Sequence, residues 1–154
     1  ILLSLACAAA QASTLTGKVV RVADGDTITV LDSHNQQHRI RFLGIDAPER
    51  SQAYGNYCRK NLAEKIAGET VEVDYQKRDR YGRITGTVYY DGRDINLEQL
   101  QDGCAWFYRY YARELNRDMR EAYNDAETQA REAGIGLWQD PHPINPYEYR
   151  RSKK

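Results

Sequence analysis

Residues 15–45 read LTGKVVRVADGDTITVLDSHNQQHRIRFLGI, and this stretch decides the fold class. It contains three runs rich in β-branched residues, over residues 15–22, 27–31 and 37–45. β-Branched residues favour strands, while the Asp-Gly and Ser-His-Asn sequences that separate the runs favour turns. We therefore predict an antiparallel meander of three strands.

The rest of the chain predicts two more strands and three helices. The strands are expected over residues 70–75 and 83–90, and the helices over residues 55–67, 96–102 and 113–133. Cys58, Leu62 and Ile66 form an apolar stripe on the first helix, and Asn96 is the expected N-cap of the second. A helix inserted after the third of five strands is the order of an OB-fold. The predicted fold class is therefore α+β, mainly a β barrel: a five-stranded OB-fold Greek-key barrel with about three helices.

Length and charge limit the classes of function. The chain has 154 residues, the size of one domain, and its 41% apolar and 29% charged residues are an ordinary globular composition. Its 22 Lys and Arg equal its 22 Asp and Glu, which excludes a simple basic nucleic-acid binder. The positive charge is uneven, however, because residues 36–93 hold 11 basic and 8 acidic residues.

Residues 1–12 resemble the end of a secretory signal peptide. They carry no charge and finish on Ala10-Gln11-Ala12, an A-x-A cleavage pattern. The alternatives are a buried first helix and a lipid anchor on Cys7. We expect one OB-fold domain over residues 13–140, a Pro-rich and basic tail over residues 141–154, and a monomeric protein that is exported to the periplasm or secreted, with no membrane span in the mature chain.

Removal of that segment leaves Cys58 and Cys104. An even number of cysteines in an exported protein is compatible with a disulfide. Free cysteine is also a common small core residue, and both cysteines lie on apolar faces. The sequence leaves the two alternatives open.

Two segments place carboxylates at the ends of predicted strands. Asp24-Gly25-Asp26-Thr27 taken alone indicates only a hairpin turn. The second segment, residues 41–49, has Arg41 on a strand that ends in Asp46-Ala47-Pro48-Glu49. An arginine in a barrel strand needs a carboxylate or phosphate partner, and Asp26 and Asp46 together suit a hard cation such as Ca²⁺.

Two further segments carry basic and aromatic side chains. Asp79-Arg80-Tyr81-Gly82-Arg83 precedes the fifth strand, and by itself it is compatible with a charged loop of no consequence. Residues 106–111, Trp-Phe-Tyr-Arg-Tyr-Tyr, combine rings with an arginine, a composition that stacks bases and binds phosphates. About half of these rings are expected to close the core beneath the last helix.

With Gly136-Leu137-Trp138 after the last helix, these segments resemble the staphylococcal-nuclease (thermonuclease) family in order and spacing. The resemblance implies Ca²⁺ held by the carboxylates of Asp26 and Asp46 and the backbone carbonyl of Ala47, with Asp24 in the outer shell. It implies the catalytic residues Arg41, Glu49 and Arg83. Substrate contacts are implied for Arg80 and Tyr81, and for tyrosines among Tyr108, Tyr110 and Tyr111. Ala47 stands where the best-known member has Thr, and the loop after Glu49 is short.

The chemistry of phosphodiester hydrolysis is consistent with this set. Two guanidinium groups and a divalent cation stabilise negative charge that develops on the phosphoryl oxygens, while a carboxylate orients the attacking water or takes its proton. By resemblance, we expect a Ca²⁺-dependent nuclease that cleaves DNA and RNA with low sequence specificity and leaves 3′-phosphates. The alternative is a non-catalytic OB-fold nucleic-acid-binding module, which has no need for all five of Asp26, Arg41, Asp46, Glu49 and Arg83.

Overall fold

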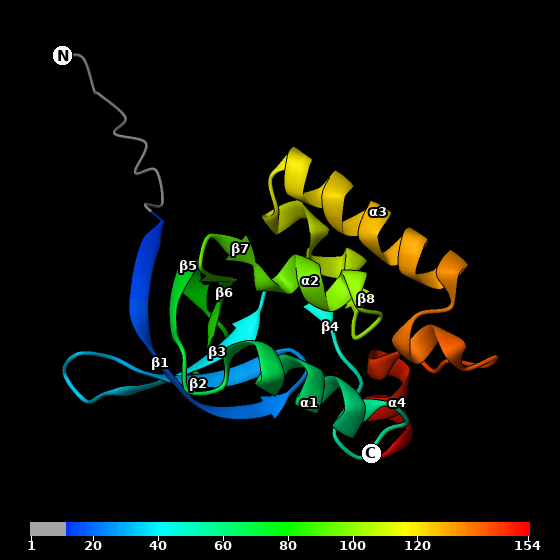
Figure 1. The fold of residues 1–154 in the computed structure, drawn as a ribbon, viewed down its shortest axis with the longest axis horizontal. Helices are drawn as coiled ribbons and strands as arrows, with labels where there is room; N and C mark the ends of the chain where they lie inside the picture. Colours follow the sequence, from blue (N-terminus) through cyan, green and yellow to red (C-terminus); the bar gives the residue numbers. More distant parts are fainter. Residues whose placement is uncertain (1–11) are drawn as a thin grey trace, which may run out of the picture.

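The computed structural model describes residues 12–154 and contains a closed five-stranded barrel (Figure 1). The barrel strands are β1 (Ser13–Asp24), β2 (Thr27–Leu31), β3 (Gln37–Phe42), β5 (Thr70–Arg78) and β6 (Ile84–Tyr90). Parallel pairing of β3 with β6 closes the barrel, with Ile40 beside Ile84. The α+β OB-fold expectation is confirmed, including the meander of the first three strands.

β1 is long because it pairs with two neighbouring strands. Its first half, residues 13–18, pairs with β5, and its second half, residues 18–24, pairs with β2. Irregular register between Val19 and Arg21 and between Val22 and Asp24 bends the second half. This bend delivers the Asp24–Asp26 turn to the end of the barrel.

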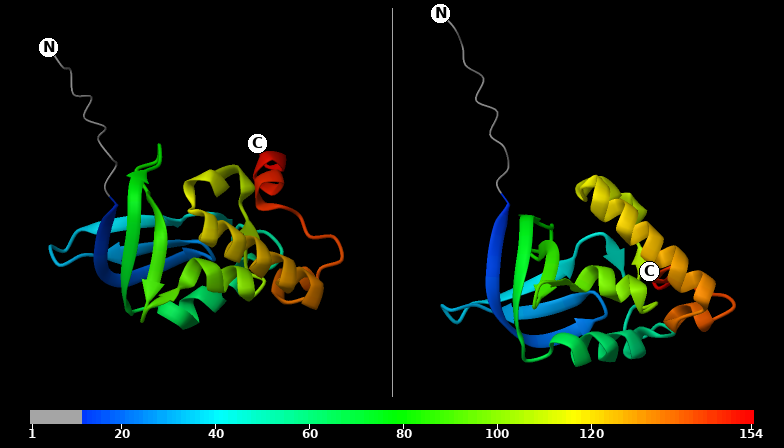
Figure 2. Two further views of the ribbon diagram at one scale, coloured as in Figure 1. Left: turned by 90° about the horizontal axis from the view of Figure 1, so that it is seen from above. Right: turned by 45° about the horizontal axis from the view of Figure 1, so that its top comes forward.

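Helices lie mainly at one side of the barrel. They are α1 (Gly55–Ile66), α2 (Ile95–Gln101), α3 (Arg117–Ala133), α4 (Pro146–Ser152) and the 3-10 helices η1 (Arg109–Glu114) and η2 (Gly136–Gln139); the short strands are β4 (Ile45–Asp46), β7 (Arg93–Asp94) and β8 (Trp106–Phe107). Figure 2 shows α2 between the barrel and α3. None of the helices in residues 12–154 combines the length and the apolar character needed to cross a membrane.

The core follows the predicted periodicities. Alternate residues of β2 and β3 are buried, and the stripe of Cys58, Leu62 and Ile66 on α1 is fully buried. Cys58 and Cys104 are buried free thiols, and hydrogen bonding to Cys104 together with burial raises the pKa of Cys58. The structure therefore places the two cysteines side by side, from α1 and from the loop after α2.

Two details of the helix predictions are wrong. Asp94, not Asn96, caps α2, because the Asp94 carboxylate accepts a 2.9 Å hydrogen bond from the Leu97 N–H. Asn96 is instead buried and binds the backbone of Leu43, Gly86 and Val88. The last long helix begins at Arg117, after an Asn116 N-cap, and residues 109–114 form η1.

The chain after residue 140 lies against the loop that follows β4. Asn145 caps α4, and Pro146 occupies its first turn. The Gln52 amide donates a 2.6 Å hydrogen bond to the Ile144 carbonyl, and the hydroxyls of Ser51 and Tyr149 are 2.9 Å apart. The expected tail thus contains a short docked helix. The expected signal-peptide remnant, residues 1–12, lies outside the described residues except for Ala12.

Candidate active site

Three neighbouring segments bring the predicted carboxylates to one end of the barrel. The β1–β2 turn supplies Asp24 and Asp26, and β4 supplies Asp46. Pairing of Thr27 with Arg41 sets β3 beside that turn, and the Phe42 N–H donates to the Asp26 carbonyl at 2.9 Å. Asp26 and Asp46 are 5% and 2% exposed, so their charges need partners.

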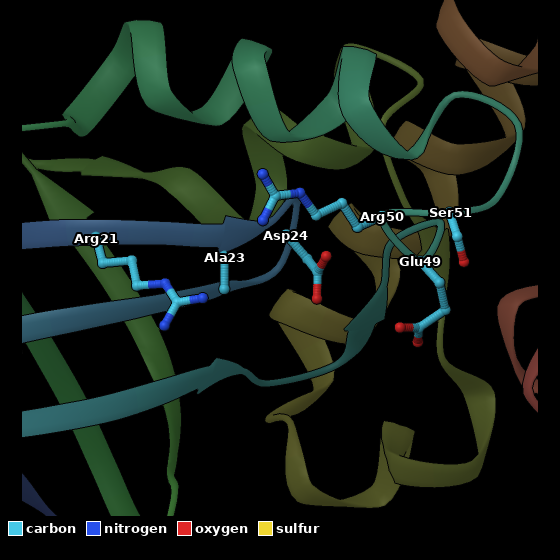
Figure 3. Close-up of a pocket in the computed structure, with 6 residues that line it drawn as sticks. All are labelled: Arg21, Ala23, Asp24, Glu49, Arg50 and Ser51. Carbon is cyan, nitrogen blue, oxygen red and sulfur yellow. The ribbon is translucent and has the colours of Figure 1, made fainter.

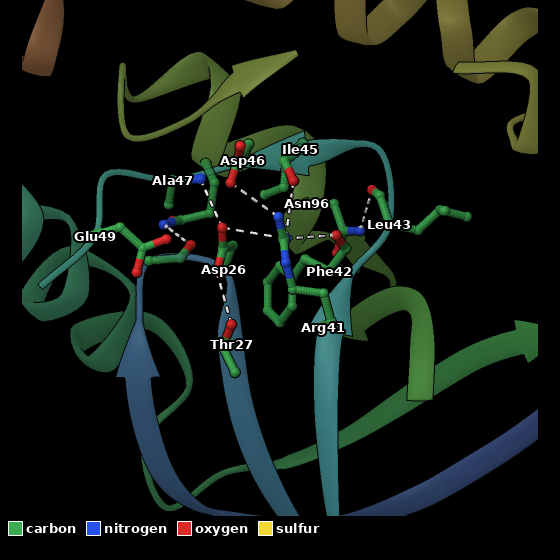
Figure 4. A network of polar contacts seen from close by, with 12 residues as sticks. Asp26, Thr27, Arg41, Phe42, Leu43, Ile45, Asp46, Ala47, Glu49 and Asn96 are labelled. Atoms are coloured by element: carbon green, nitrogen blue, oxygen red, sulfur yellow. Dashed lines mark hydrogen bonds and ion pairs between the residues drawn. The ribbon is translucent and has the colours of Figure 1, made fainter. Parts of the chain in front are cut away.

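Arg41 provides these partners (Figure 4). Its Nη1 lies 3.2 Å from Asp26 Oδ2, and its Nη2 donates to Asp46 Oδ1 at 3.0 Å. The same guanidinium donates to the carbonyls of Phe42 and Ile45 at 3.0 and 2.9 Å. The arginine that the sequence placed in a barrel strand therefore bridges the two carboxylates.

Asp26 also fixes the backbone after β4. Its Oδ2 accepts a 2.6 Å hydrogen bond from the Ala47 N–H, and its Oδ1 accepts one from the Thr27 hydroxyl at 2.8 Å. The Asp-Gly-Asp-Thr segment is therefore more than a hairpin turn, because its second carboxylate orients the peptide that the resemblance assigns to the metal.

The carboxylates carry an excess of negative charge. Burial, together with the charges of Asp26 and Glu49, raises the pKa of Asp24 to about 6. Burial likewise raises the pKa of Asp46, although Arg150 and Arg41 oppose the change. A cation added here would relieve the repulsion between these groups.

The donor set fits a hard cation. Within residues 12–154, no three His, Cys, Asp or Glu side chains converge as a complete metal site. Asp26 and Asp46 contact one guanidinium and so lie close together, with the Ala47 peptide held against Asp26. Two carboxylates completed by carbonyl oxygen and water are a donor set that Ca²⁺ accepts.

Glu49 follows directly, on a loop fixed by Gln52. The Gln52 side chain accepts a hydrogen bond from the Glu49 N–H at 3.1 Å, and the Gln52 N–H donates to the Glu49 carbonyl at 2.8 Å. Glu49 lines an open cavity of about 550 Å³ with Arg21, Ala23, Asp24, Arg50 and Ser51. Figure 3 shows the Asp24 carboxylate between Arg21 and Glu49 in this view. The cavity gives solvent and substrate a path to both carboxylates.

Arg83 lies just before β6 and outside the Arg41 network. β6 places Thr85 beside Arg41, and Arg83 immediately precedes the first residue of that strand, Ile84. Its Nε donates to Asp79 Oδ2 at 2.7 Å. The structure thus brings together Asp24, Asp26, Arg41, Asp46, Ala47 and Glu49, and leaves Arg83 at the rim.

Arg80 and Tyr81 lie on the turn between β5 and β6. Asp79 shapes this turn by accepting from the N–H groups of Tyr81 and Arg83 at 2.9 and 3.0 Å. Tyr81 is 58% exposed, and the Arg80 guanidinium lies 4.8 Å from its ring centroid. The turn therefore presents an exposed ring with positive charge beside it.

The tyrosines of residues 108–111 form a small aromatic cluster. Ring centroids of Tyr108 and Tyr111 are 5.0 Å apart, and those of Tyr110 and Tyr111 are 4.9 Å apart. Burial and the charge of Asp46 raise the pKa of Tyr108, whereas Tyr110 is 70% exposed. The charge of Asp46 therefore acts on the Tyr108 hydroxyl.

The other residues of this segment are structural. Phe107 is buried and packs edge-on against Tyr123, with ring centroids 6.5 Å apart. Arg109 pairs with the buried Glu127 at 3.2 Å, which offsets the cost of burying that carboxylate. Phe107 is the one buried ring among residues 106–111, which is fewer than the predicted half.

Sequence reasoning missed Arg150. Its Nη1 donates to Asp46 Oδ1 at 3.0 Å and to Glu49 Oε1 at 2.8 Å, and its Nη2 donates to Asp46 Oδ2 at 2.9 Å. The basic ending Arg150-Arg151-Ser152-Lys153-Lys154 is typical of a solvated tail. Asn145-Pro146 was the available signal, since Asn at the N-cap and Pro at the first position mark a helix start.

Comparisons with known proteins agree with this geometry. The family described as "Staphylococcal nuclease homologue" matches residues 39–140. The chain is 39% identical over 139 residues to "Uncharacterized endonuclease" of Haemophilus influenzae, covering 90% of this chain and 75% of the relative. It is 42% identical over 147 residues to "Micrococcal nuclease" of Shigella flexneri, covering 90% and 82%. It is 44% identical over 140 residues to "Uncharacterized endonuclease" of Escherichia coli, covering 89% and 86%.

Proposed function

The chain belongs to the staphylococcal nuclease family and is a nuclease, and we propose that it is an exported, monomeric, Ca²⁺-dependent enzyme that cleaves DNA and RNA with little sequence specificity and leaves 3′-phosphates. The observation that carries this proposal is the bridge that Arg41 makes between Asp26 and Asp46. The bridge brings together two carboxylates that suit a metal ion and a guanidinium that suits a phosphate group. A protein that only binds nucleic acid has no use for that combination.

The reaction needs stabilisation of negative charge on the phosphoryl group. Arg41 supplies fixed positive charge beside the carboxylates, and Arg83 supplies a second guanidinium from the rim. Asp26, Asp46 and the Ala47 carbonyl would hold Ca²⁺, which would supply Lewis-acid stabilisation of the same charge. Groups that are already oriented toward developing charge lower the barrier because they need no reorganisation during the reaction.

We assign Glu49 to the attacking water. Its carboxylate lies at the open cavity, and the side-chain and backbone bonds to Gln52 fix the peptide that carries it. A carboxylate held there accepts a hydrogen bond from water and directs it in line with the leaving group. We therefore assign Glu49 to the nucleophile, as the group that orients the attacking water or takes its proton.

Low sequence specificity follows from the type of contacts available. Arg80 and Arg83 bind phosphates, which are the same at every nucleotide, and Tyr81 and Tyr108 offer ring faces on which any base stacks. Arg21 and Arg50 add positive charge at the cavity beside Glu49. This set recognises a polynucleotide backbone and does not read base edges.

Digestion of labelled single-stranded and double-stranded DNA and RNA, with Ca²⁺, with Mg²⁺ and with a chelator, tests the activity. We expect cleavage with Ca²⁺, loss of cleavage with chelator, and products that carry 3′-phosphates. Glu49→Gln should lose activity, whereas the matched substitution Glu121→Gln on the exposed face of α3 should not. Cleavage indifferent to the chelator would refute the cation assignment, and binding without cleavage would establish the binding-module alternative.

Export is tested separately. The proposal rests on the uncharged run and the Ala10-Gln11-Ala12 pattern. N-terminal sequencing of the protein recovered from outside the cytoplasm should begin at Ser13. A chain that stays in the cytoplasm with residues 1–12 attached would contradict it.

A further inference from the structure

Arg150 is a further arginine at the candidate site, and it comes from α4. It is separated by 104 residues from Asp46 and by 101 from Glu49, yet its guanidinium bonds both. Nη1 and Nη2 bind the two oxygens of Asp46 at 3.0 and 2.9 Å, the forked geometry of a strong arginine–carboxylate pair. Nη1 also binds Glu49 at 2.8 Å.

The docking of α4 makes this contact specific. Asn145 caps the helix, Pro146 is buried, and Tyr149 meets Ser51 on the loop that carries Glu49. The preceding Ile144 carbonyl accepts the Gln52 amide hydrogen bond at 2.6 Å. Arg150 is therefore positioned by contacts just before its helix and within it.

The position of Arg150 conflicts with cation binding. Asp46 Oδ1 already accepts from Arg41 and Arg150, and Asp46 Oδ2 accepts from Arg150. Oδ2 is the Asp46 oxygen that Arg41 leaves free, so a divalent cation bound at Asp46 beside Arg41 needs the oxygen that Arg150 occupies. Oε1 of Glu49 is engaged by the same guanidinium. Arg150 and a divalent cation therefore compete for Asp46 Oδ2.

We propose that α4 is an autoinhibitory arm, in which Arg150 competes with a divalent cation for Asp46 and occupies Glu49, so that cation binding releases the arm and opens the site. The cleavage consequence rests on the proposed function, but the competition itself does not. The arm is easily displaced because α4 is short, with seven residues, and because the Arg150 side chain is 36% exposed. A pair with that exposure is screened by water, so its effect on cation affinity is about tenfold, or about 1.4 kcal/mol.

Calorimetric titration of Ca²⁺ into the full-length protein without substrate tests the competition. The variants are Arg150→Gln and, as a matched control, Arg151→Gln. Arg151 is on the same helix and carries the same charge, but its guanidinium lies over the Tyr147 ring, 5.8 Å from the centroid. We expect Arg150→Gln to bind Ca²⁺ about tenfold more tightly than the parent protein and the control. Equal or weaker affinity in Arg150→Gln, or no binding by any of the three, overturns the proposal.

Limited trypsin digestion gives an independent readout of release. If cation binding frees α4, Ca²⁺ should accelerate cleavage after Arg150 and Arg151 at least severalfold in the parent protein, while cleavage elsewhere slows or is unchanged. Unchanged or slower cleavage at these two sites with saturating Ca²⁺ overturns the release step.

Nuclease assays separate this inference from the proposed function. Tighter Ca²⁺ binding by Arg150→Gln without nuclease activity in any protein supports the arm and refutes the activity. Unchanged Ca²⁺ affinity with a raised KM for DNA makes Arg150 a phosphate ligand and overturns the arm.

Discussion

Replacing Arg41 by alanine tests the central bridge most directly. The substitution removes four hydrogen bonds and ion pairs at once, leaving Asp26, Asp46 and two carbonyls without this partner. Both carboxylates are buried, so water does not replace the lost guanidinium. Arg83→Ala is the comparison, because Arg83 pairs with Asp79 at 2.7 Å with both side chains more than a fifth exposed.

The expected costs differ between the two arginines. Removing one partner of a buried ion pair typically costs about 3–5 kcal/mol, a large part of the roughly 5–15 kcal/mol that stabilises a domain. Removing an arginine from an exposed pair costs about 1 kcal/mol or less. We therefore expect Arg41→Ala to fold with greatly reduced stability and Arg83→Ala to fold with nearly normal stability. Both should lose on the order of a hundredfold or more in turnover.

Denaturant unfolding with chelator, repeated with Ca²⁺, measures these differences. Because a cation between Asp26 and Asp46 takes over part of the neutralisation, Ca²⁺ should shrink the stability deficit of Arg41→Ala but not that of Arg83→Ala. A deficit below about 1 kcal/mol in chelator would refute the claim that Arg41 neutralises buried charge. Near-normal turnover in either variant would refute its catalytic assignment.

Three further predictions follow from the same geometry. The pKa of Asp24 is raised from 3.8 to about 6, so this group favours the folded state below pH 4 and loses that contribution as pH rises through 6. In chelator, Asp24→Asn should be more stable than the parent at pH 8, by about 1–2 kcal/mol because Asp24 is only half-buried, and equal to it below pH 4; a constant difference in denaturant unfolding across this range refutes the shift. Tyr108→Ala should raise the KM for single-stranded DNA about fivefold or more in steady-state assays, from loss of a stacking ring, and an unchanged KM would remove Tyr108 from the substrate site. Cys58 and Cys104 should form a disulfide when the chain is made in an oxidising compartment, shown by a mass lower by two hydrogens before reduction, and two free thiols would contradict it.

Local patterns were sufficient for the barrel. Turn dipeptides and β-branched runs in residues 15–45 act over a few neighbours, so the meander could be predicted without knowledge of its partners. The N-cap residue of α2 could not be predicted from local sequence. Asp94 and Asn96 are both good capping residues, and the choice depends on carbonyls of Leu43 and Gly86 that need the Asn96 amide.

Some contacts of the candidate site could likewise be predicted from the sequence, and others could not. Strand alternation placed Arg41 where it required a carboxylate, and carboxylates ended the neighbouring strands, so the bridge to Asp26 and Asp46 was foreseeable from charge and burial. Arg83 immediately precedes β6, the strand that pairs with β3, but its hydrogen bonds go to Asp79, which only the geometry of the turn determines. The contact of Arg150 with Asp46 spans 104 residues, beyond any local pattern.

The electrostatics of the site explain why an arm and a cation compete for it. Asp24, Asp26, Asp46 and Glu49 are four carboxylates, and Arg41 neutralises part of their charge through fixed contacts. The burial that lets a metal bind strongly also makes the unneutralised cluster costly, as the raised pKa of Asp24 shows. Without a metal, the Arg150 guanidinium relieves that cost at Asp46 and Glu49. An arm that stabilises the metal-free protein must therefore weaken cation affinity by the same amount of free energy, since binding has to displace it.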